Sequence, residues 1–393
     1  MTITRRGNNA FVLTVPGALR AFMAPHIRAI CAINDVTVYS NFAADDCANL
    51  FADCPPGTVT LVHVGFERKI RLMTDLKTWW HLFRALRRGQ HDSVHSLMPK
   101  TGLIAMTAGL AARTPIRIHM FTGQVWATMS GWRRSIMKMF DRLIAVSATH
   151  LLADSPSQRD FLIGNHIARN IDVIGAGSVC GVDLKRFAPD LEDKARLRAK
   201  FGMDSSHILF GFLGRLNRDK GLLDLAEAFA FANLPNTCRL MLVGPDEDLI
   251  ADAIHHIHGD MAGKLIVVGL TSEPDRFVNM FDLFCLPSYR EGFGTSIIEA
   301  AACAVPAIAS DIYGLTDAVQ NGTTGLLHEP RNVGEIIIFL ERTAKDAALR
   351  AQLGQAARHR VERYFGQEHL IKAMLEYYAS IGLTAQITNQ TSL

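Results

Sequence analysis

Short apolar runs alternate with longer amphipathic stretches along most of the chain. In the first half, seven runs have the length and composition of buried strands, at residues 10–15, 36–39, 59–64, 93–96, 116–120, 142–146 and 171–174. Between them, helical patterns cover residues 68–88, 100–112 and 132–141. Strands that alternate with helices predict βαβ units and a parallel sheet.

The alternation restarts after a segment rich in glycine, at residues 175–183, which is followed by Pro189 and is the linker candidate. After a charged helical stretch at 191–201, five further strands are expected, at 208–213, 239–243, 265–268, 283–286 and 307–309. Helices are expected at the end of the chain, at 332–344, 347–364 and 367–380. The pattern therefore predicts two doubly wound α/β domains, the second starting near Ser205.

Length and composition fit this reading. The chain has 393 residues, of which 49% are hydrophobic and 20% charged, and no uncharged apolar run reaches the ~18 residues of a membrane span. Its seven cysteines are scattered and form no C-x-x-C pair, which argues against a disulfide framework or a zinc site. Polar residues interrupt any signal-peptide core near the N-terminus, so we expect a cytoplasmic protein.

The net charge of +3 hides an asymmetry, because residues 1–170 carry +10 and residues 171–393 carry −7. No nucleic-acid-binding motif accompanies the basic half. Two expected helices have apolar stripes, one of Trp79, Phe83 and Leu86, the other of Trp132, Ile136 and Phe140. Either these stripes pack on the sheet beneath solvated cations, or the basic faces contact an anionic membrane. The cations concerned are Arg84, Arg87, Arg88, Arg133, Arg134 and Lys138.

Two cations follow the first strand of the second domain. Gly214 permits close backbone approach after that strand, and Arg215 and Lys220 precede the next helix. Cations beside a helix N-terminus suit a diphosphate, since the helix dipole adds to their charge. The alternative is a pair of solvated surface cations at a turn.

Two carboxylates flank a glycine-rich turn, Gly292-Phe293-Gly294, that precedes a helix opening near Thr295. Glu291 and Glu299 suit hydrogen bonds to the hydroxyls of a ribose and a hexose, with Glu299 one helical turn past Thr295. The alternatives are a surface carboxylate for Glu291 and a helix-dipole partner for Glu299. Asp246-Glu-Asp248 has the form of a metal-binding Asp-x-Asp, but a solvated turn is favoured there.

The order and spacing of these motifs resemble the GT4-type retaining glycosyltransferases of the GT-B fold. The matching segments are Gly-Arg-x4-Lys-Gly at 214–221, Val-Gly-Pro-Asp at 243–246, Pro-Ser-x2-Glu-Gly-Phe-Gly-x4-Glu-Ala at 287–300, Ala-Val-Pro at 304–306 and Gly-Thr-Thr-Gly at 322–325. The resemblance implies that Glu291 contacts the donor sugar, Glu299 the nucleotide ribose, and Arg215 and Lys220 the diphosphate. It also implies that the turn at 292–294, together with Gly214 and Thr295, lies against the donor.

The first half is similar to bacterial enzymes that extend polyprenyl-diphosphate-linked sugars. The similarity rests on segments such as Thr-Val-Pro at 14–16 and the stretches 94–102 and 117–123. The family usually has a histidine where Thr122 stands, and many members have paired glycines where this chain has only Gly17. Acceptor-side candidates are Gly17, His95, Lys100, His119 and Thr122, although histidines at strand ends, such as His95 and His119, are more often structural than catalytic.

The resemblance implies two Rossmann-like domains facing a central cleft. Residues 1–185 would bind the acceptor, residues 186–366 the nucleotide sugar, a helix at 367–382 would cross back to the first domain, and 383–393 would form a tail. The expected reaction is retaining transfer of a hexose or N-acetylhexosamine from a nucleotide diphosphate sugar, a UDP-sugar by expectation, without metal or other cofactor.

The expected acceptor is a saccharide, in particular one linked to polyprenyl diphosphate at the inner face of the cell membrane. An anionic membrane surface is a further expected partner, and nucleic acid is not. The competing functions are a phosphorylase or a nucleotide-sugar epimerase on the same fold, or a catalytically silent nucleotide-sugar-binding subunit.

Overall fold

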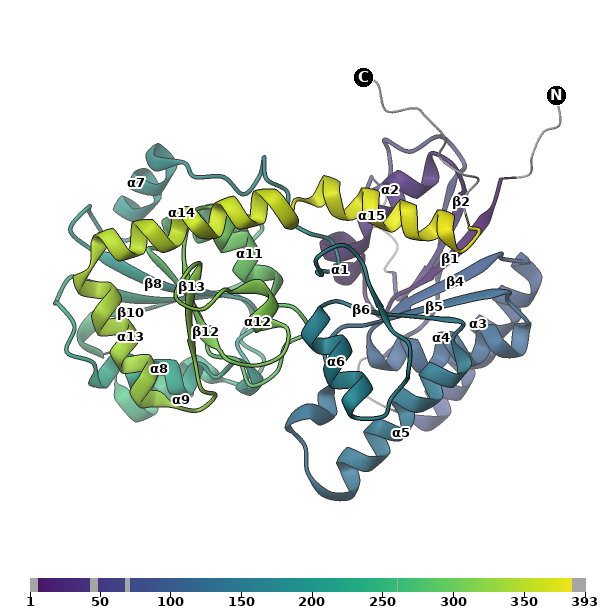
Figure 1. The fold of residues 1–393 in the computed structure, drawn as a ribbon, viewed down its shortest axis with the longest axis horizontal. Coiled ribbons are helices and arrows are strands. Elements are labelled where there is room, and N and C mark those ends of the chain that lie inside the picture. The colour runs from purple at the N-terminus through teal and green to yellow at the C-terminus, as the bar shows by residue number, and fades with distance from the viewer. Residues whose placement is uncertain (1–5, 43–48, 68–70, 260, 384–393) are drawn as a thin grey trace. The chain divides into compact units, whose positions relative to one another are not determined.

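The computed structural model describes residues 6–42, 49–67, 71–259 and 261–383 and divides them into two compact units (Figure 1). Unit 1 runs to Cys180 and takes in the chain again from Gln367, and unit 2 is Gly181–Gly366. Cys47, the start of the helix expected at 68–88, and the expected tail beyond residue 383 lie outside the described residues. Within the described ranges, every helix falls short of the length and hydropathy of a membrane span.

Unit 1 contains a seven-stranded parallel sheet in the order β3-β2-β1-β4-β5-β6-β7. Its strands are β1 Asn8–Val12, β2 Asp35–Ser40, β3 Val59–His63, β4 Ser93–Leu97, β5 Ile116–Phe121, β6 His150–Ala153 and β7 Asp172–Val173. Its helical segments are α1 Pro16–Ala18, the π-helix η1 Leu19–Met23, α2 Ala24–Cys31, α3 Leu72–Gly89, α4 Pro99–Ala112, the 3-10 helix η2 Val125–Thr128, α5 Gly131–Ser147, α6 Pro156–Gly164 and α15 Gln367–Ser380.

Two buried hydrophobic clusters in unit 1 hold the helices to the sheet. One contains buried residues of α3, α4 and α5, and the other contains residues of α2 and α15. Helix α15 contributes Leu370, Met374 and Tyr378 to its cluster, and it packs against α2. The last helix of the described chain is therefore part of the core of unit 1.

Residues 142–146, expected as a strand, are helical. Helix α5 continues to Ser147, and the strand that follows, β6, begins only at His150. Ile144 is buried, whereas Leu143 and Val146 are exposed. The run Arg-Leu-Ile-Ala-Val is therefore apolar on two sides of one helix, and its composition imitates a short buried strand.

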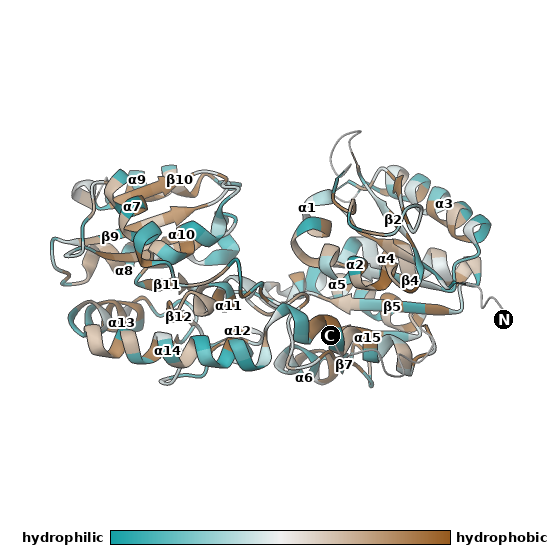
Figure 2. Ribbon diagram, turned by 90° about the horizontal axis from the view of Figure 1, so that it is seen from above, coloured by the Kyte–Doolittle hydropathy of each residue, from teal (hydrophilic) through white to brown (hydrophobic). Residues whose placement is uncertain are grey.

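Unit 2 contains a six-stranded parallel sheet in the order β10-β9-β8-β11-β12-β13, with predominantly hydrophobic strands (Figure 2). The strands are β8 Ile208–Leu213, β9 Cys238–Val243, β10 Leu265–Val268, β11 Leu283–Leu286, β12 Ala307–Ser310 and β13 Gly325–His328. The helical segments are α7 Leu191–Lys200, α8 Leu222–Phe231, α9 Ile250–His258, α10 Pro274–Met280, α11 Thr295–Ala302, α12 Leu315–Ala318, α13 Val333–Lys345 and α14 Ala347–Tyr364, with the 3-10 turns η3 Arg218–Lys220 and η4 Met261–Gly263.

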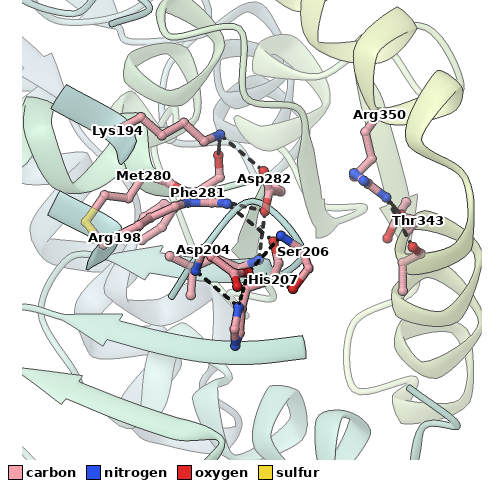
Figure 3. Close-up of polar contacts among 12 residues, drawn as sticks. Lys194, Arg198, Asp204, Ser206, His207, Met280, Phe281, Asp282, Thr343 and Arg350 are labelled. Carbon is pink, nitrogen blue, oxygen red and sulfur yellow. Dashed lines mark hydrogen bonds and ion pairs between the residues drawn. The ribbon is translucent and has the colours of Figure 1, made fainter. Parts of the chain in front are cut away.

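A polar network at the start of β11 ties this strand to β8 and α7 (Figure 3). The Asp282 carboxylate accepts hydrogen bonds from the backbone N–H of Leu209 at 2.8 Å and from the guanidinium of Arg198 at 2.6 Å, and Lys194 Nζ lies 3.1 Å from it. Although burial opposes ionisation, Lys194 and Arg198 lower the pKa of Asp282. The network fixes β11 beside β8, the two strands that lead into the site described next.

Candidate active site

The carboxyl ends of β8 and β11 lie next to each other in the second sheet. The chain runs outward from β8 to β9 and β10 and then returns to β11 on the other side of β8. In open α/β sheets, ligands bind at the carboxyl edge where the strand order reverses in this way. The two motifs singled out in the sequence both begin at this point of the fold.

Two glycines let the loops of this edge pack closely. Gly221 has φ 65°, and a Cβ there would lie 2.0 Å from the carbonyl oxygen of Pro287, at the end of β11. Gly314 has φ 84°, and a Cβ there would lie 2.1 Å from the carbonyl oxygen of Gly292. Any other residue at either position would force these backbones apart.

Lys220 and Glu291 form an ion pair across the two loops. Their side chains are 18% and 14% exposed, and Ser288 Oγ donates a 2.9 Å hydrogen bond to the same carboxylate oxygen of Glu291. The fold thus brings together two predicted site residues that are far apart in sequence. Ser288 is a site residue that the sequence reasoning missed, because nothing local indicates which way its hydroxyl points.

A second set of contacts fastens the loop that carries Glu291. The backbone N–H of Tyr289 donates to the carbonyl of Asp219 at 2.8 Å, and the Arg290 guanidinium pairs with the Asp219 carboxylate. The Tyr289 hydroxyl donates to Asp224 at 2.8 Å. These residues were also missed, and they hold the loops on which Lys220 and Glu291 are carried.

Arg215 is placed differently from Lys220. Its side chain is 56% exposed and its Nη1 lies 2.8 Å from a carboxylate oxygen of Glu247. Among the described residues, no hydrogen bond or ion pair joins Arg215 to Lys220 or Glu291. The sequence predicted the position of Arg215 after β8, but not its acidic partner in the loop after β9.

The Asp-x-Asp segment binds backbone groups. The Asp246 carboxylate accepts from the N–H groups of Ile250 and Ala251 at 2.8 and 2.9 Å, at the start of α9, and Asp248 accepts from the N–H of Arg218 at 2.9 Å. These contacts favour the turn interpretation. Within the described ranges, no group of three or more His, Cys, Asp or Glu side chains could hold a metal ion.

The glycine-rich turn leads into α11 as expected. Gly292, Phe293 and Gly294 are buried, and Thr295, half-buried, is the first residue of the helix. No side chain caps this N-terminus and its first turn contains no acidic residue. In the described part of the chain, the Ile297 N–H donates to the Gly294 carbonyl at 2.9 Å, and the N–H groups of Thr295 and Ser296 remain available to an anion.

Glu299 lies half-buried on α11. Burial raises the pKa of its carboxyl to about 7, with Arg186 lowering it and Asp275 raising it further. Within the described part of the chain, this carboxylate forms no hydrogen bond or ion pair, and therefore none with Lys220 or Glu291. Because its pKa is about 7, the carboxyl group of Glu299 can accept a hydrogen bond and changes its protonation state near neutral pH.

The two histidine candidates of unit 1 lie in its core. His95 Nδ1 bonds the hydroxyl of Tyr378 on α15, and His119 Nδ1 lies 2.9 Å from Ser96 Oγ. Burial lowers the pKa of each imidazole to about 3, so both are neutral at pH 7. Their side chains are buried, which favours a structural role over contact with an acceptor.

The other acceptor-side candidates lie nearer the surface. Gly17 is exposed in α1, with open space where a Cβ would be. Lys100, in the first turn of α4, pairs with Asp75 at 2.7 Å. Thr122 is half-buried directly after β5. The described contacts do not bring these three residues together.

Two family profiles match the chain, one on each unit. The profile described as glycosyl transferases group 1 matches residues 193–360, and the glycosyl transferase 4-like domain matches residues 21–177. The first match covers the loops after β8 and β11, including Arg215, Lys220, Glu291 and Glu299.

Named relatives match most of the chain. The capsular polysaccharide biosynthesis glycosyltransferase CapM of Staphylococcus aureus is 28% identical over 80% of this chain and 83% of its own length. The UDP-Gal:α-D-GlcNAc-diphosphoundecaprenol α-1,3-galactosyltransferase of Escherichia coli is 30% identical over 72% of this chain and 74% of its own.

The fold matches that of solved structures. Anabaena HepE, crystallised with UDP and glucose and with UDP-glucose, aligns with TM-scores of 0.78 and 0.76 over 95% of this chain and 99% of its own, at 17% identity. With two Rossmann-like units, the group 1 motifs at the ends of β8 and β11, and relatives that span most of its length, the chain belongs to the GT4 family of glycosyltransferases and has the GT-B fold.

Proposed function

We propose that this glycosyltransferase moves a hexose or N-acetylhexosamine from a UDP-sugar to a saccharide carried on polyprenyl diphosphate, with retention of configuration. The observation that carries the donor half is the Lys220–Glu291 pair at the ends of β8 and β11. It combines a cation for a phosphate with a carboxylate for sugar hydroxyls. The names of the relatives support the rest, since HepE binds UDP-glucose and the Escherichia coli enzyme acts on a diphosphoundecaprenol-linked sugar.

The barrier to this reaction is charge separation, because the sugar becomes oxocarbenium-like while the diphosphate leaves. Lys220, Arg215 and the uncapped first turn of α11 would stabilise the leaving anion. A lysine ammonium has three N–H donors, so Lys220 can hold a phosphate oxygen while it stays bound to Glu291. With these charges supplied by the chain, the transfer needs no metal ion.

The remaining donor contacts follow from the same loops. Glu291 and the backbone N–H groups of the 292–294 turn would orient the hexose, and the Thr295 hydroxyl would lie against the phosphates. Glu299 would accept hydrogen bonds from the ribose. A leaving phosphate oxygen on the same face of the sugar can take the acceptor proton, so the reaction does not require a separate base.

Unit 1 is the proposed acceptor unit. Gly17, Lys100 and Thr122 are exposed or half-buried residues near the carboxyl ends of β1, β4 and β5, the edge at which open sheets of this type bind ligands. A polyprenyl-linked acceptor places the reaction at the cytoplasmic face of a membrane, where we propose that the protein associates peripherally.

The test is nucleotide release by the purified protein, measured for a panel of nucleotide sugars with and without a polyprenyl-diphosphate-linked acceptor. We expect acceptor-dependent UDP release, and NMR of the product should show the donor's anomeric configuration. Sugar transfer to inorganic phosphate would indicate a phosphorylase, interconversion of the donor an epimerase, and binding without turnover a silent subunit. Thermal shift identifies the donor first, because a ligand at 100 times its Kd adds about 2.7 kcal/mol of stability.

A further inference from the structure

Helix α5 turns a row of large hydrophobic side chains away from the core. Trp132 and Val146 are 70% and 76% exposed, and Met139 and Leu143 between them are also exposed. Spacings of three, four and seven residues put these four side chains on one side of the helix. Ile144, in contrast, is buried. The helix therefore has two apolar faces, only one of which is covered.

Helix α3 has the same property over its first half. Leu72 is 82% exposed and Trp80 50%, and Met73 and Leu76 are exposed between them. Leu82 on this helix is buried in the core of unit 1. Single exposed hydrophobic residues are ordinary on a protein surface, but a contiguous set of this kind marks an interaction site.

Both helices pack against α4 and share one core cluster, so they cover the same face of the first sheet (Figure 1). We call their outward side the α3–α5 face. Its apolar residues are Leu72, Met73, Leu76, Trp80, Trp132, Met139, Leu143 and Val146, and its exposed cations are Lys77, Arg84, Arg87, Arg88 and Arg133.

The acidic residues of the two helices do not offset these cations. Asp75 of α3 pairs with Lys100 of α4 at 2.7 Å. Asp141 of α5 is buried and accepts a 2.6 Å hydrogen bond from the indole N–H of Trp126. The α3–α5 face is thus both hydrophobic and cationic.

Arg134 and Lys138, expected from the sequence to belong to such a face, do not. They lie over the ring of Trp126, 5.6 and 5.2 Å from its centroid, and both bond the side chain of Asn165. Trp132, which one of the two alternatives drawn from the sequence packs on the sheet, is exposed. The structure therefore keeps four of the six cations selected from the sequence, Arg84, Arg87, Arg88 and Arg133, on the exposed face and adds Lys77.

We propose that the α3–α5 face docks on an anionic phospholipid bilayer. Helices with exposed Trp and Leu beside Lys and Arg lie at a membrane interface, with the apolar side chains in the acyl boundary and the cations among the headgroups. A second copy of this chain would bring the same positive charges together, which opposes self-association through this face. The inference deepens the proposed function, because a lipid-linked acceptor lies in such a bilayer.

The experiment measures partition of the purified full chain onto vesicles by sedimentation. Vesicles of phosphatidylcholine with 30% phosphatidylglycerol are compared with pure phosphatidylcholine, at low and high salt. We expect binding to the anionic vesicles that falls at high salt, because surface charges are screened beyond about 8 Å at physiological ionic strength. Brominated lipid should quench the tryptophan fluorescence of the parent more than that of the Trp80→Ser/Trp132→Ser variant, in which only Trp79 and Trp126 still emit.

Two variants, each with a matched control, distinguish the contribution of the cations to vesicle binding from that of the hydrophobic residues. The Arg84→Gln/Arg87→Gln/Arg88→Gln variant should bind anionic vesicles roughly 100-fold more weakly, from roughly fivefold for each cation near the surface. The same change at Lys200, Arg342 and Lys345, exposed cations of unit 2, should have little effect.

The contribution of the exposed hydrophobic residues of the α3–α5 face is tested in the same way. Trp80→Ser/Trp132→Ser should weaken binding at every salt concentration, whereas Phe231→Ser/Leu270→Ser, exposed hydrophobic positions of unit 2, should not. Circular dichroism checks that each variant is folded. These four positions carry no proposed contact with donor or acceptor.

Equal partition onto neutral and anionic vesicles at low salt, or an equal loss in the unit 2 controls, would overturn the proposal. So would a dimer in sedimentation velocity that the Trp80→Ser/Trp132→Ser variant converts to monomer, since a second copy would then cover the face. Transfer to a detergent-dispersed short-chain acceptor is measured in parallel. A variant that loses vesicle binding but still transfers sugar to the detergent-dispersed acceptor shows that the face serves membrane docking and not catalysis. Loss of sugar transfer with vesicle binding unchanged would contradict the proposed function but not the docking proposal.

Discussion

Replacing Glu299 by glutamine should change how the stability of the protein depends on pH. Burial raises the pKa of this carboxyl from 4.5 to about 7 in the folded chain. Between these values the folded state holds a proton that the unfolded state has released. Folding therefore becomes less favourable as the pH rises through this window, and the loss is complete above the folded pKa. Glutamine resembles the protonated carboxyl and does not titrate.

The size of the effect follows from the shift. Each pKa unit corresponds to about 1.4 kcal/mol, so the ionised carboxylate costs about 3 kcal/mol of unfolding free energy at pH 8. Glu299→Gln should match the parent protein at pH 4.5 and exceed it by about this amount at pH 8. Buried histidines give both proteins a further pH dependence, but this cancels in the difference between them.

Urea denaturation followed by far-UV circular dichroism at several pH values is the suitable assay. Tryptophan fluorescence is not, because Trp79, Trp80, Trp126 and Trp132 all lie in unit 1. If the free energy of unfolding depends on pH in the same way in the parent protein and in Glu299→Gln, the reasoning is refuted. They would mean that the carboxylate is solvated in the folded state and that burial does not raise its pKa.

Four further outcomes are expected. Lys220→Ala and Arg215→Ala should each lower turnover by about 10²–10³, the scale for losing one group at a developing anion, and near-normal kcat in either would remove that residue from the diphosphate site. Glu299→Ala should weaken UDP binding by roughly 1.5–3 kcal/mol in calorimetry, whereas Glu291→Ala should mainly lower kcat. Transfer should survive EDTA, and restoration of a lost activity by manganese would contradict this. Tyr378→Phe should destabilise unit 1 by about 1–3 kcal/mol in urea followed by tryptophan fluorescence, because it removes a buried hydrogen bond.

Most of the fold could be predicted because buried parallel strands are short apolar runs bounded by turns. The strands at 208–213, 265–268 and 283–286 are observed with the predicted limits. The error at 142–146 has a physical cause, since a short apolar run suits a buried strand and a helix with two apolar faces equally well. Strand β13, Gly325–His328, was not predicted because its neighbours in the sheet, rather than its own four residues, define it.

The site could be predicted as a set of positions but not as a set of contacts. A glycine-rich turn before a helix is visible in the sequence, and so is a cation after a strand. The pairing of Lys220 with Glu291, and of Arg215 with Glu247, depends on which loops the fold places together. Similarly, burial on α11 gives Glu299 its raised pKa, and spacing alone could suggest the direction of its side chain but not its environment.

The position of α15 in unit 1 bears on how the chain folds during synthesis. Leu370, Met374, Tyr378 and Leu383 complete a core whose other buried residues are made before unit 2 begins. At roughly 5–20 residues per second, the ribosome needs on the order of 10–40 s to pass from Gly181 to Gly366. Throughout that interval the surface of α2 that receives α15 has no partner from the same chain. We therefore expect nascent unit 1 to depend on chaperones for longer than unit 2, although it is translated first.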